Sequence, residues 1–200
     1  MERTARLLPA RRRLRKALPA LLFFTDPART PDPLAAARAL PPGSGIVYRA
    51  FGDPGALATA RALKQVARAR GLVLLVGQDA QLAAAAGADG VHLPERLARL
   101  AMPLKRARPG WIVTAAAHSL AAARTPGPDA VVISAAFPSN SPSAGPPLGP
   151  VRLAALARAA GRPAYALGGV NMKTARRLRD AGLIGLAAVE GLSPETSART

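Results

Sequence analysis

Two adjacent glycines, Gly168 and Gly169, carry the clearest chemical signal in the sequence. Because they lack Cβ atoms, main-chain N–H groups at this point can come close to an anion. Asn171 is placed to cap a following helix, whose N-terminus favours negative charge. The arrangement predicts a phosphate-binding loop. The alternative is a tight turn without a ligand, because glycine pairs are frequent in turns.

Three further side chains stand where short apolar runs end. Arg49 is a candidate catalytic residue with a planar guanidinium, which is suited to holding a phosphate. His92 is equally well explained as a ligand contact or as a half-buried histidine. His118 is the candidate catalytic histidine. The alternative for His118 is a simple helix start with Ser119 as the N-cap, because the sequence identifies no partner carboxylate for a Ser-His-Asp triad.

A stretch rich in Pro, Ser and Gly, residues 137–150, has neither helical nor strand periodicity. A loop of this length inside a compact domain is usually functional or disordered. Its Ser139, Asn140 and Ser141 offer hydroxyls and donors that suit a phosphate or pyrophosphate. A polar loop without a special purpose is the alternative. Elsewhere, no two carboxylates or histidines have convincing metal-ligand spacing.

The elements that must position these residues repeat along the chain. From residue 21, a short apolar run, a turn and an Ala/Leu/Arg stretch with helical spacing follow one another. The expected strands are Leu21–Thr25, Gly45–Ala50, Leu72–Val76, Gly90–Leu93, Trp111–Ala115, Ala130–Ser134, Ala164–Leu167 and Ile184–Val189. The expected helices are Leu34–Leu40, Pro54–Arg70, Ala80–Ala86, Glu95–Leu100, Leu120–Arg124, Val151–Ala160 and Met172–Ala181.

Strands that alternate with helices indicate right-handed βαβ units and a parallel sheet. Eight such units predict a single α/β domain, a parallel eight-stranded (β/α)8 TIM barrel with a shortened last helix. An open flavodoxin-like or Rossmann sheet is the rival, but neither a G-x-G-x-x-G nor a G-x-x-x-x-G-K-[ST] motif occurs. Loops after the seventh and eighth strands of a barrel often hold phosphate, which adds Glu190 and Gly191 to Gly168 and Gly169 as ligand-binding candidates.

The 200 residues fit one domain, with 50% hydrophobic residues, 4% aromatic residues and no cysteine. We expect a basic tail or extra helix over residues 1–20, the barrel over 21–192 and a C-terminal tail over 193–200. No apolar run approaches the roughly 18 to 20 residues that cross a bilayer. A soluble protein without a membrane partner, located in the cytoplasm, is the simplest expectation.

The net charge of +17 raises the question of nucleic-acid binding. Most of the basic residues are arginines scattered over expected helix faces, and no aromatic residues are interleaved for base stacking. We therefore expect a solvated tail rather than a nucleic-acid partner, although a basic arm stays open as an alternative at the one dense cluster, Arg11, Arg12, Arg13, Arg15 and Lys16.

Several stretches, taken in order, resemble the thiamine-phosphate synthase and thiazole tautomerase family of barrels. The likeness runs from about Leu21 to Leu192, nearly the whole chain. The stretches that carry it are Gly87–Leu93, Ala117–Leu120 with Asp129–Val131, Phe137–Ser141 with Pro147–Gly149, and Tyr165–Val170.

The resemblance implies a transferase of thiamine biosynthesis or salvage. Synthases of this family join a pyrimidine pyrophosphate to a thiazole phosphate and release pyrophosphate with the help of Mg²⁺. By this resemblance Arg49 faces the pyrophosphate, Gly168 and Gly169 cradle the thiazole phosphate, and Ser139 and Ser141 stand where the family usually has threonines. The partners are then the two small phosphorylated substrates, and a homodimer is compatible with this reading.

The chain departs from the family pattern at several functional positions. The metal-binding carboxylate after the third strand falls at Gln78, so we take Gln78 as a ligand-binding candidate and the adjacent Asp79 as the candidate metal ligand. Losing one electrostatic donor costs roughly 10²- to 10³-fold in rate, so impaired activity or a non-catalytic binder is an alternative to an active synthase. By the same resemblance, other family residues are also replaced: lysines by Phe51 and Pro142, a second metal-binding carboxylate by Leu97, a serine by Ala116 and the catalytic histidine of the tautomerase by Ala135.

Overall fold

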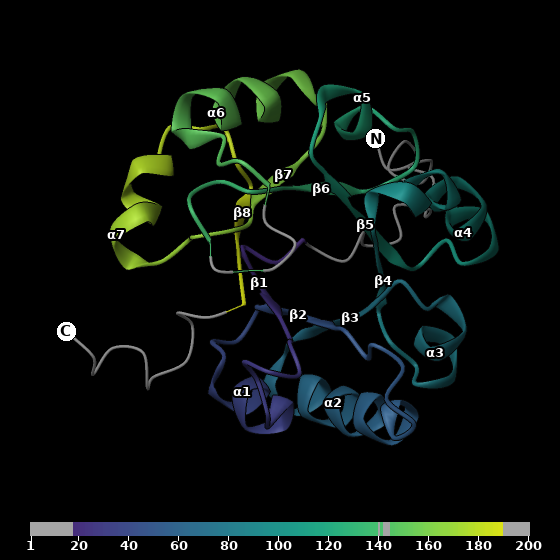
Figure 1. The fold of residues 1–200 in the computed structure, drawn as a ribbon. Coiled ribbons are helices and arrows are strands. Elements are labelled where there is room, and N and C mark those ends of the chain that lie inside the picture. The colour runs from purple at the N-terminus through teal and green to yellow at the C-terminus, as the bar shows by residue number, and fades with distance from the viewer. Residues whose placement is uncertain (1–17, 140, 142–144, 190–200) are drawn as a thin grey trace, which may run out of the picture.

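The computed structural model describes residues 18–139, 141 and 145–189. Its strands form one closed parallel barrel in the order β1 to β8, with the helices outside it (Figure 1). The barrel closes because β1 pairs with β8, where Leu21 lies opposite Leu186 and Phe23 opposite Ala188. The predicted parallel barrel is therefore confirmed, and the alternative of an open sheet is wrong. Residues 190–200 and the basic cluster at residues 11–16 lie outside the described residues.

The eight strands agree with the expected runs to within two residues at each end. They are β1 (Leu21–Phe24), β2 (Gly45–Tyr48), β3 (Val73–Gly77), β4 (Gly90–Leu93), β5 (Ile112–Ala117), β6 (Ala130–Ile133), β7 (Ala164–Ala166) and β8 (Gly185–Ala188).

The helices differ from expectation in two places. An α-helix that was not expected follows the 3₁₀ helix after β4. Pro103 is compatible with it, because the proline stands in the first turn, where no intrahelical N–H bond is lost. The expected helix 172–181 is a short α-helix followed by a 3₁₀ turn. The helices are α1 (Pro33–Ala39), α2 (Ala56–Arg70), α3 (Ala80–Ala85), η1 (Glu95–Leu100), α4 (Ala101–Ala107), α5 (Leu120–Ala123), α6 (Gly149–Ala159), α7 (Met172–Ala175) and η2 (Arg176–Leu178). No helix in the described part is both long and apolar enough to span a membrane.

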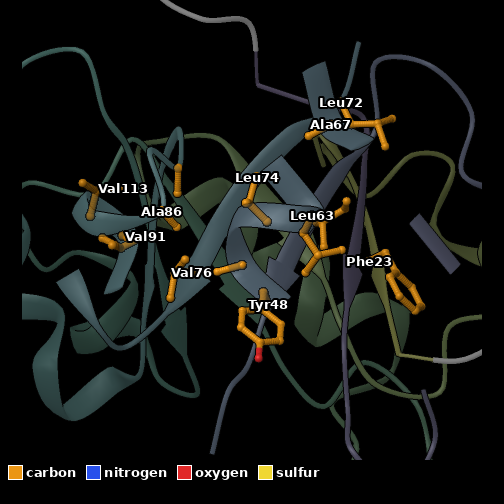
Figure 2. Close-up of a cluster of buried hydrophobic side chains, with 14 of the residues drawn as sticks. Phe23, Tyr48, Leu63, Ala67, Leu72, Leu74, Val76, Ala86, Val91 and Val113 are labelled. Carbon is orange, nitrogen blue, oxygen red and sulfur yellow. The ribbon is translucent and has the colours of Figure 1, made fainter. Parts of the chain in front are cut away.

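Two apolar layers hold the barrel together. The outer layer packs helices on strands, and Figure 2 shows Leu63 of α2 beside Leu74 of β3. The inner layer fills the barrel with alternate strand residues. It comprises Leu22, Phe24, Val47, Leu75, Ile112, Ala130, Val132, Tyr165 and Ala187.

Two partly buried Lys–Asp pairs tie helices to strands where β4 and β6 begin. Asp89 accepts hydrogen bonds from the main-chain N–H of Leu74 at 3.0 Å and from Lys64 of α2 at 2.7 Å. Asp129, which precedes β6, forms the same two kinds of hydrogen bond. It accepts from the main-chain N–H of Val113 at 2.9 Å and from Lys105 of α4 at 2.9 Å. Each carboxylate joins an outer helix to the edge of a neighbouring strand.

The alternation of side chains decides which polar residues face the barrel mouth. Successive strand residues point to opposite faces, so a residue two positions beyond an inward one also points inward. Arg49 follows inward Val47 by two positions, and Thr114 follows inward Ile112 in the same way. His92 lies opposite Thr114 in the β4–β5 register. Arg49, His92 and Thr114 therefore belong to the inner face at the carboxyl ends of the strands.

Candidate functional site

The loop after β7 needs both of its glycines. Gly168 and Gly169 have φ values of 95° and 61°, which L side chains rarely adopt. A Cβ atom at Gly169 would lie 2.3 Å from the carbonyl oxygen of Pro138. The close approach arises because the long loop after β6 is hydrogen-bonded to this one, with the N–H of Phe137 donating to the oxygen of Gly168 at 3.0 Å. The two loops thus form one packed unit at the mouth.

This loop also has free donors. Within the described part of the chain, the N–H groups of Gly168, Gly169 and Val170 donate to no other group. The helix behind them contributes less than the sequence predicted. It has only four residues, and the side chain of Asn171 already accepts from the N–H groups of its first turn at 2.9 and 3.0 Å. Any anion held here therefore depends on the loop amides.

Arg49 is fixed at the end of β2 by the loop after β1. Its Nε donates to the carbonyl oxygen of Thr25 at 2.6 Å, and its Nη2 donates to Asp26 at 3.1 Å. The Arg49 guanidinium lies 5.9 Å from the ring of Phe24 and 5.1 Å from that of Phe51. The ring of Phe51 thus stacks on the arginine and adds no second positive charge.

The surroundings of Arg49 are partly acidic. The hydrogen bond from Arg29, opposed by burial, lowers the pKa of Asp26, so this carboxylate offsets part of the positive charge. A groove of about 440 Å³ opens beside Arg49 and is lined by Asp26, Tyr48 and Asp53 among others. Burial lowers the pKa of Arg49, but a guanidinium titrates so high that it stays charged at neutral pH.

His92 lies buried at the top of the barrel, with 8% of its surface exposed. Its Nδ1 is 2.9 Å from Oγ1 of Thr114, and its ring meets Phe24 edge-on at 4.9 Å. Burial, assisted by the charge of Arg49, lowers the pKa of His92 to about 3. The imidazole is therefore neutral at physiological pH and packs between Phe24 and Thr114. A ligand contact by His92 stays a prediction.

His118 has the carboxylate partner that the sequence did not reveal. Oε2 of Glu95 lies 2.7 Å from Nδ1 of His118 and also accepts from its main-chain N–H at 2.7 Å. Glu95 opens η1 directly after β4, and His118 follows β5, so pairing of these two strands brings them together. Ser119 caps α5 by accepting from the N–H of Ala122 at 3.2 Å, which confirms the predicted helix start. The structure therefore contains a Glu–His pair beside a capping serine.

The rim after β3 bears on the magnesium that the resemblance implies. Gln78 has a φ of 66° and accepts a hydrogen bond from Nη2 of Arg96 at 2.5 Å. The carboxylate of Asp79 caps α3 by accepting from the N–H of Leu82 at 2.8 Å. Leu97 is apolar, and no group of three or more His, Asp or Glu side chains in the described part gathers to hold a metal. Mg²⁺ requires oxygen ligands, usually carboxylates, in octahedral geometry, so the residues present do not fit it.

The remaining candidates lie on the long loop after β6 and beyond β8. Oγ of Ser139 accepts from the main-chain N–H of Ser141 at 3.3 Å, so the two serines lie close together. Asn140, Glu190 and Gly191 lie outside the described residues. The described ends of the loop are held by the N–H of Leu148, which donates to the oxygen of Ala135 at 2.9 Å.

Fold and site together define a parallel (β/α)8 barrel whose mouth carries a glycine loop with free amides, an inward arginine and a Glu–His pair. The chain belongs to the thiamine monophosphate synthase family, whose model matches residues 22–192. The family resemblance inferred from the sequence is thereby confirmed, and with it a place in thiamine biosynthesis.

Individual relatives agree with this assignment. The chain is 34% identical over 180 residues to the thiamine-phosphate synthase of Chromobacterium violaceum, covering 82% of this chain and 86% of that protein. A relative from Aquifex aeolicus is 32% identical over 120 residues, which cover 58% of this chain and 64% of its own length. A thiamine phosphate pyrophosphorylase from Pyrococcus furiosus shares the fold, with a TM-score of 0.72 at 24% identity over 84% of this chain and 83% of that one.

Proposed function

We propose that this chain is a cytoplasmic transferase of thiamine biosynthesis that binds a thiazole monophosphate at its barrel mouth and joins it to a pyrimidine pyrophosphate. The observation that carries the proposal is the glycine loop after β7. Gly168 and Gly169 present free N–H donors at the end of the barrel where such enzymes hold phosphate. Main-chain donors of this kind bind an oxyanion without a compensating cation.

Arg49 is the proposed contact for the pyrophosphate group. It points into the mouth, and Thr25 and Asp26 use only two of its five N–H donors. The remaining donors can bind phosphate oxygens and stabilise the charge that builds up on pyrophosphate as it leaves. Ser139 and Ser141 are proposed to contribute hydroxyl contacts from the long loop. Because Asp26 offsets part of its charge, we expect Arg49 to act with a second cation.

The Glu95–His118 pair is proposed to orient substrate at the same mouth. The carboxylate contacts Nδ1 of the histidine, so Nε2 is the ring nitrogen that a ligand would contact. In this arrangement the pair can position a polar group of the pyrimidine or exchange a proton with it.

Calorimetric titration with thiazole monophosphate tests the phosphate cradle, by which we mean the loop amides at Gly168 and Gly169. Gly168→Ala forces a side chain into the left-handed region and places its Cβ 3.1 Å from Ala135, so the amides are displaced. We expect the Kd to rise about tenfold or more, the cost of a lost hydrogen bond to a charged group. Gly182→Ala is the matched control, because Gly182 has a φ of 71° but its Cβ would meet only Arg158, at 3.6 Å. Equal affinities for the two variants would refute the cradle.

A second candidate function is binding of the phosphorylated ligand without catalysis. It is favoured by apolar side chains at positions where the resemblance implies polar residues. Phe51 stacks on Arg49, and Leu97 and Ala116 carry no hydrogen-bonding group. Tight thiazole-phosphate binding without release of pyrophosphate from the pyrimidine substrate would support this function. Steady product formation would exclude it.

A further inference from the structure

One cation at the barrel rim is held in place without being neutralised. Arg96, in η1 after β4, donates from Nη2 to the side-chain oxygen of Gln78 at 2.5 Å. Gln78 is itself fixed directly beyond β3, because its main-chain N–H donates to the carbonyl oxygen of His92 at 2.7 Å. The Arg96 side chain therefore spans two neighbouring strand ends at the mouth.

The partner of Arg96 is a neutral amide, so this contact does not reduce the positive charge of the guanidinium. Asp26 offsets the charge of Arg49, whereas Arg96 forms no ion pair within the described residues. Its neighbour Glu95 is already engaged with His118. A carboxylate at Gln78 would orient the guanidinium equally well but would cancel its charge. The amide positions the cation and leaves it available to an anion.

The geometry of Gln78 suits this positioning role. Its φ of 66° lies in the left-handed region, which non-glycine residues rarely adopt and which often occurs where function requires it. Both side chains are exposed to solvent, so an incoming ligand can reach them. One of the five N–H donors of Arg96 is used on Gln78, and the remainder can form a fork with phosphate oxygens.

We propose that the guanidinium of Arg96, positioned by Gln78, neutralises a di- or pyrophosphate group at this rim in place of a divalent metal ion. The inference rests on the proposed function for the presence of a pyrophosphate ligand. The proposal follows from the hydrogen bonds at this rim. The side-chain oxygen of Gln78, which a metal would need as a ligand, already accepts from Arg96, and the carboxylate of the adjacent Asp79 caps α3. Pyrophosphate binding by this chain is then independent of Mg²⁺.

The test is calorimetric titration of the full chain with inorganic pyrophosphate, in EDTA and in excess Mg²⁺. We expect the wild-type Kd in EDTA to match that in Mg²⁺ within about twofold. Arg96→Gln should raise the Kd in EDTA by about ten- to a hundredfold, the effect of losing charge-assisted hydrogen bonds. The matched control is Arg99→Gln, an exposed arginine of the same 3₁₀ turn, which should bind as the wild type does.

Gln78→Glu provides a second variant that keeps the side-chain length. The new carboxylate should pair with Arg96, cancel its charge and weaken pyrophosphate binding about as much as Arg96→Gln. Binding that EDTA abolishes in the wild type would overturn the proposal, as would equal affinities of Arg96→Gln and Arg99→Gln. So would an absence of pyrophosphate binding in both solutions.

The same samples are titrated with thiazole monophosphate, which separates the two proposals. Thiazole-phosphate binding without pyrophosphate binding overturns the role of Arg96 and leaves the cradle at Gly168 intact. Pyrophosphate binding that depends on Arg96, without thiazole-phosphate binding, supports the role of Arg96 and overturns the proposed function.

Discussion

Replacing Asp89 by Asn tests how far the two Lys–Asp pairs under the barrel stabilise it. The amide can still accept from the N–H of Leu74, but it leaves the ammonium of Lys64 without its counter-charge. The side chains of Lys64 and Asp89 are only 12% and 10% exposed, so solvent compensates little of the lost charge. Breaking a buried pair costs about 3–5 kcal/mol, and partial access to water puts Asp89→Asn near the lower figure, about 3 kcal/mol.

Asp129→Asn is the internal comparison, because Asp129 uses the same geometry with more solvent. Lys105 is 25% exposed, Asp129 is 14% exposed, and the ammonium also donates to the carbonyl oxygen of Trp111 at 2.8 Å. In this variant Lys105 keeps a hydrogen-bond partner, so we expect the free energy of unfolding to fall by about 2 kcal/mol. For a domain of this size, the two variants should lower Tm by roughly 6–12 °C and 4–8 °C.

The assay is chemical denaturation followed by circular dichroism, at neutral pH and fixed ionic strength, for both variants and for Lys64→Met/Asp89→Asn. Removing both charges should recover part of the loss, since no unpaired ammonium is then buried. A larger cost for Asp129→Asn than for Asp89→Asn would refute the role given to burial, as would a double variant less stable than Asp89→Asn.

The remaining predictions concern two buried polar groups inside the barrel. Burial lowers the pKa of His92 from 6.5 to about 3, so the unfolded chain binds the proton first, and the free energy of unfolding should fall as pH drops through that window. The slope should approach about 1.4 kcal/mol per pH unit, and His92→Gln, compared by urea titration at several pH values, should lose this contribution. The hydroxyl of Tyr165 donates to the carbonyl oxygen of Pro19 at 2.7 Å, so Tyr165→Phe should cost about 1–2 kcal/mol in the same titration at pH 7, and an unchanged midpoint would contradict this.

The fold could be predicted from the sequence because strand and helix signals agree with each other. β4 was located correctly at both ends, since Asp89 and Gly90 introduce a short, fully buried run. A Cβ at Gly90 would lie 1.8 Å from the oxygen of Ile112, so the glycine also reflects close packing of the neighbouring strand. α4 was not predicted from the sequence; its first turn contains Pro103, at a position where a proline loses no intrahelical hydrogen bond.

Among the ligand-facing side chains of the candidate site, the predictable one acts through its place at the end of a strand. Arg49 was expected at the mouth from its position at the end of β2, and the structure places it on the inner face. Its contacts with Thr25 and Asp26, like the contact of Glu95 with His118, join residues 23 or 24 positions apart. No periodicity encodes such pairs. The useful signal would have been that Glu95 and His118 both follow adjacent strands.

The described ends of the long loop after β6 are joined by main-chain hydrogen bonds. Leu148 and Gly149 donate to the carbonyl oxygens of Ala135 and Ala136 at 2.9 and 3.0 Å, so the two ends of the loop are held together beside β6 and α6. Because the ends are fixed in this way, we expect that the segment between them can be exchanged for segments of different length and composition without shifting β6 or α6. Since the proposed hydroxyl contacts of Ser139 and Ser141 lie in this segment, we expect that replacing residues 139–147 together alters the substrate preference of the barrel.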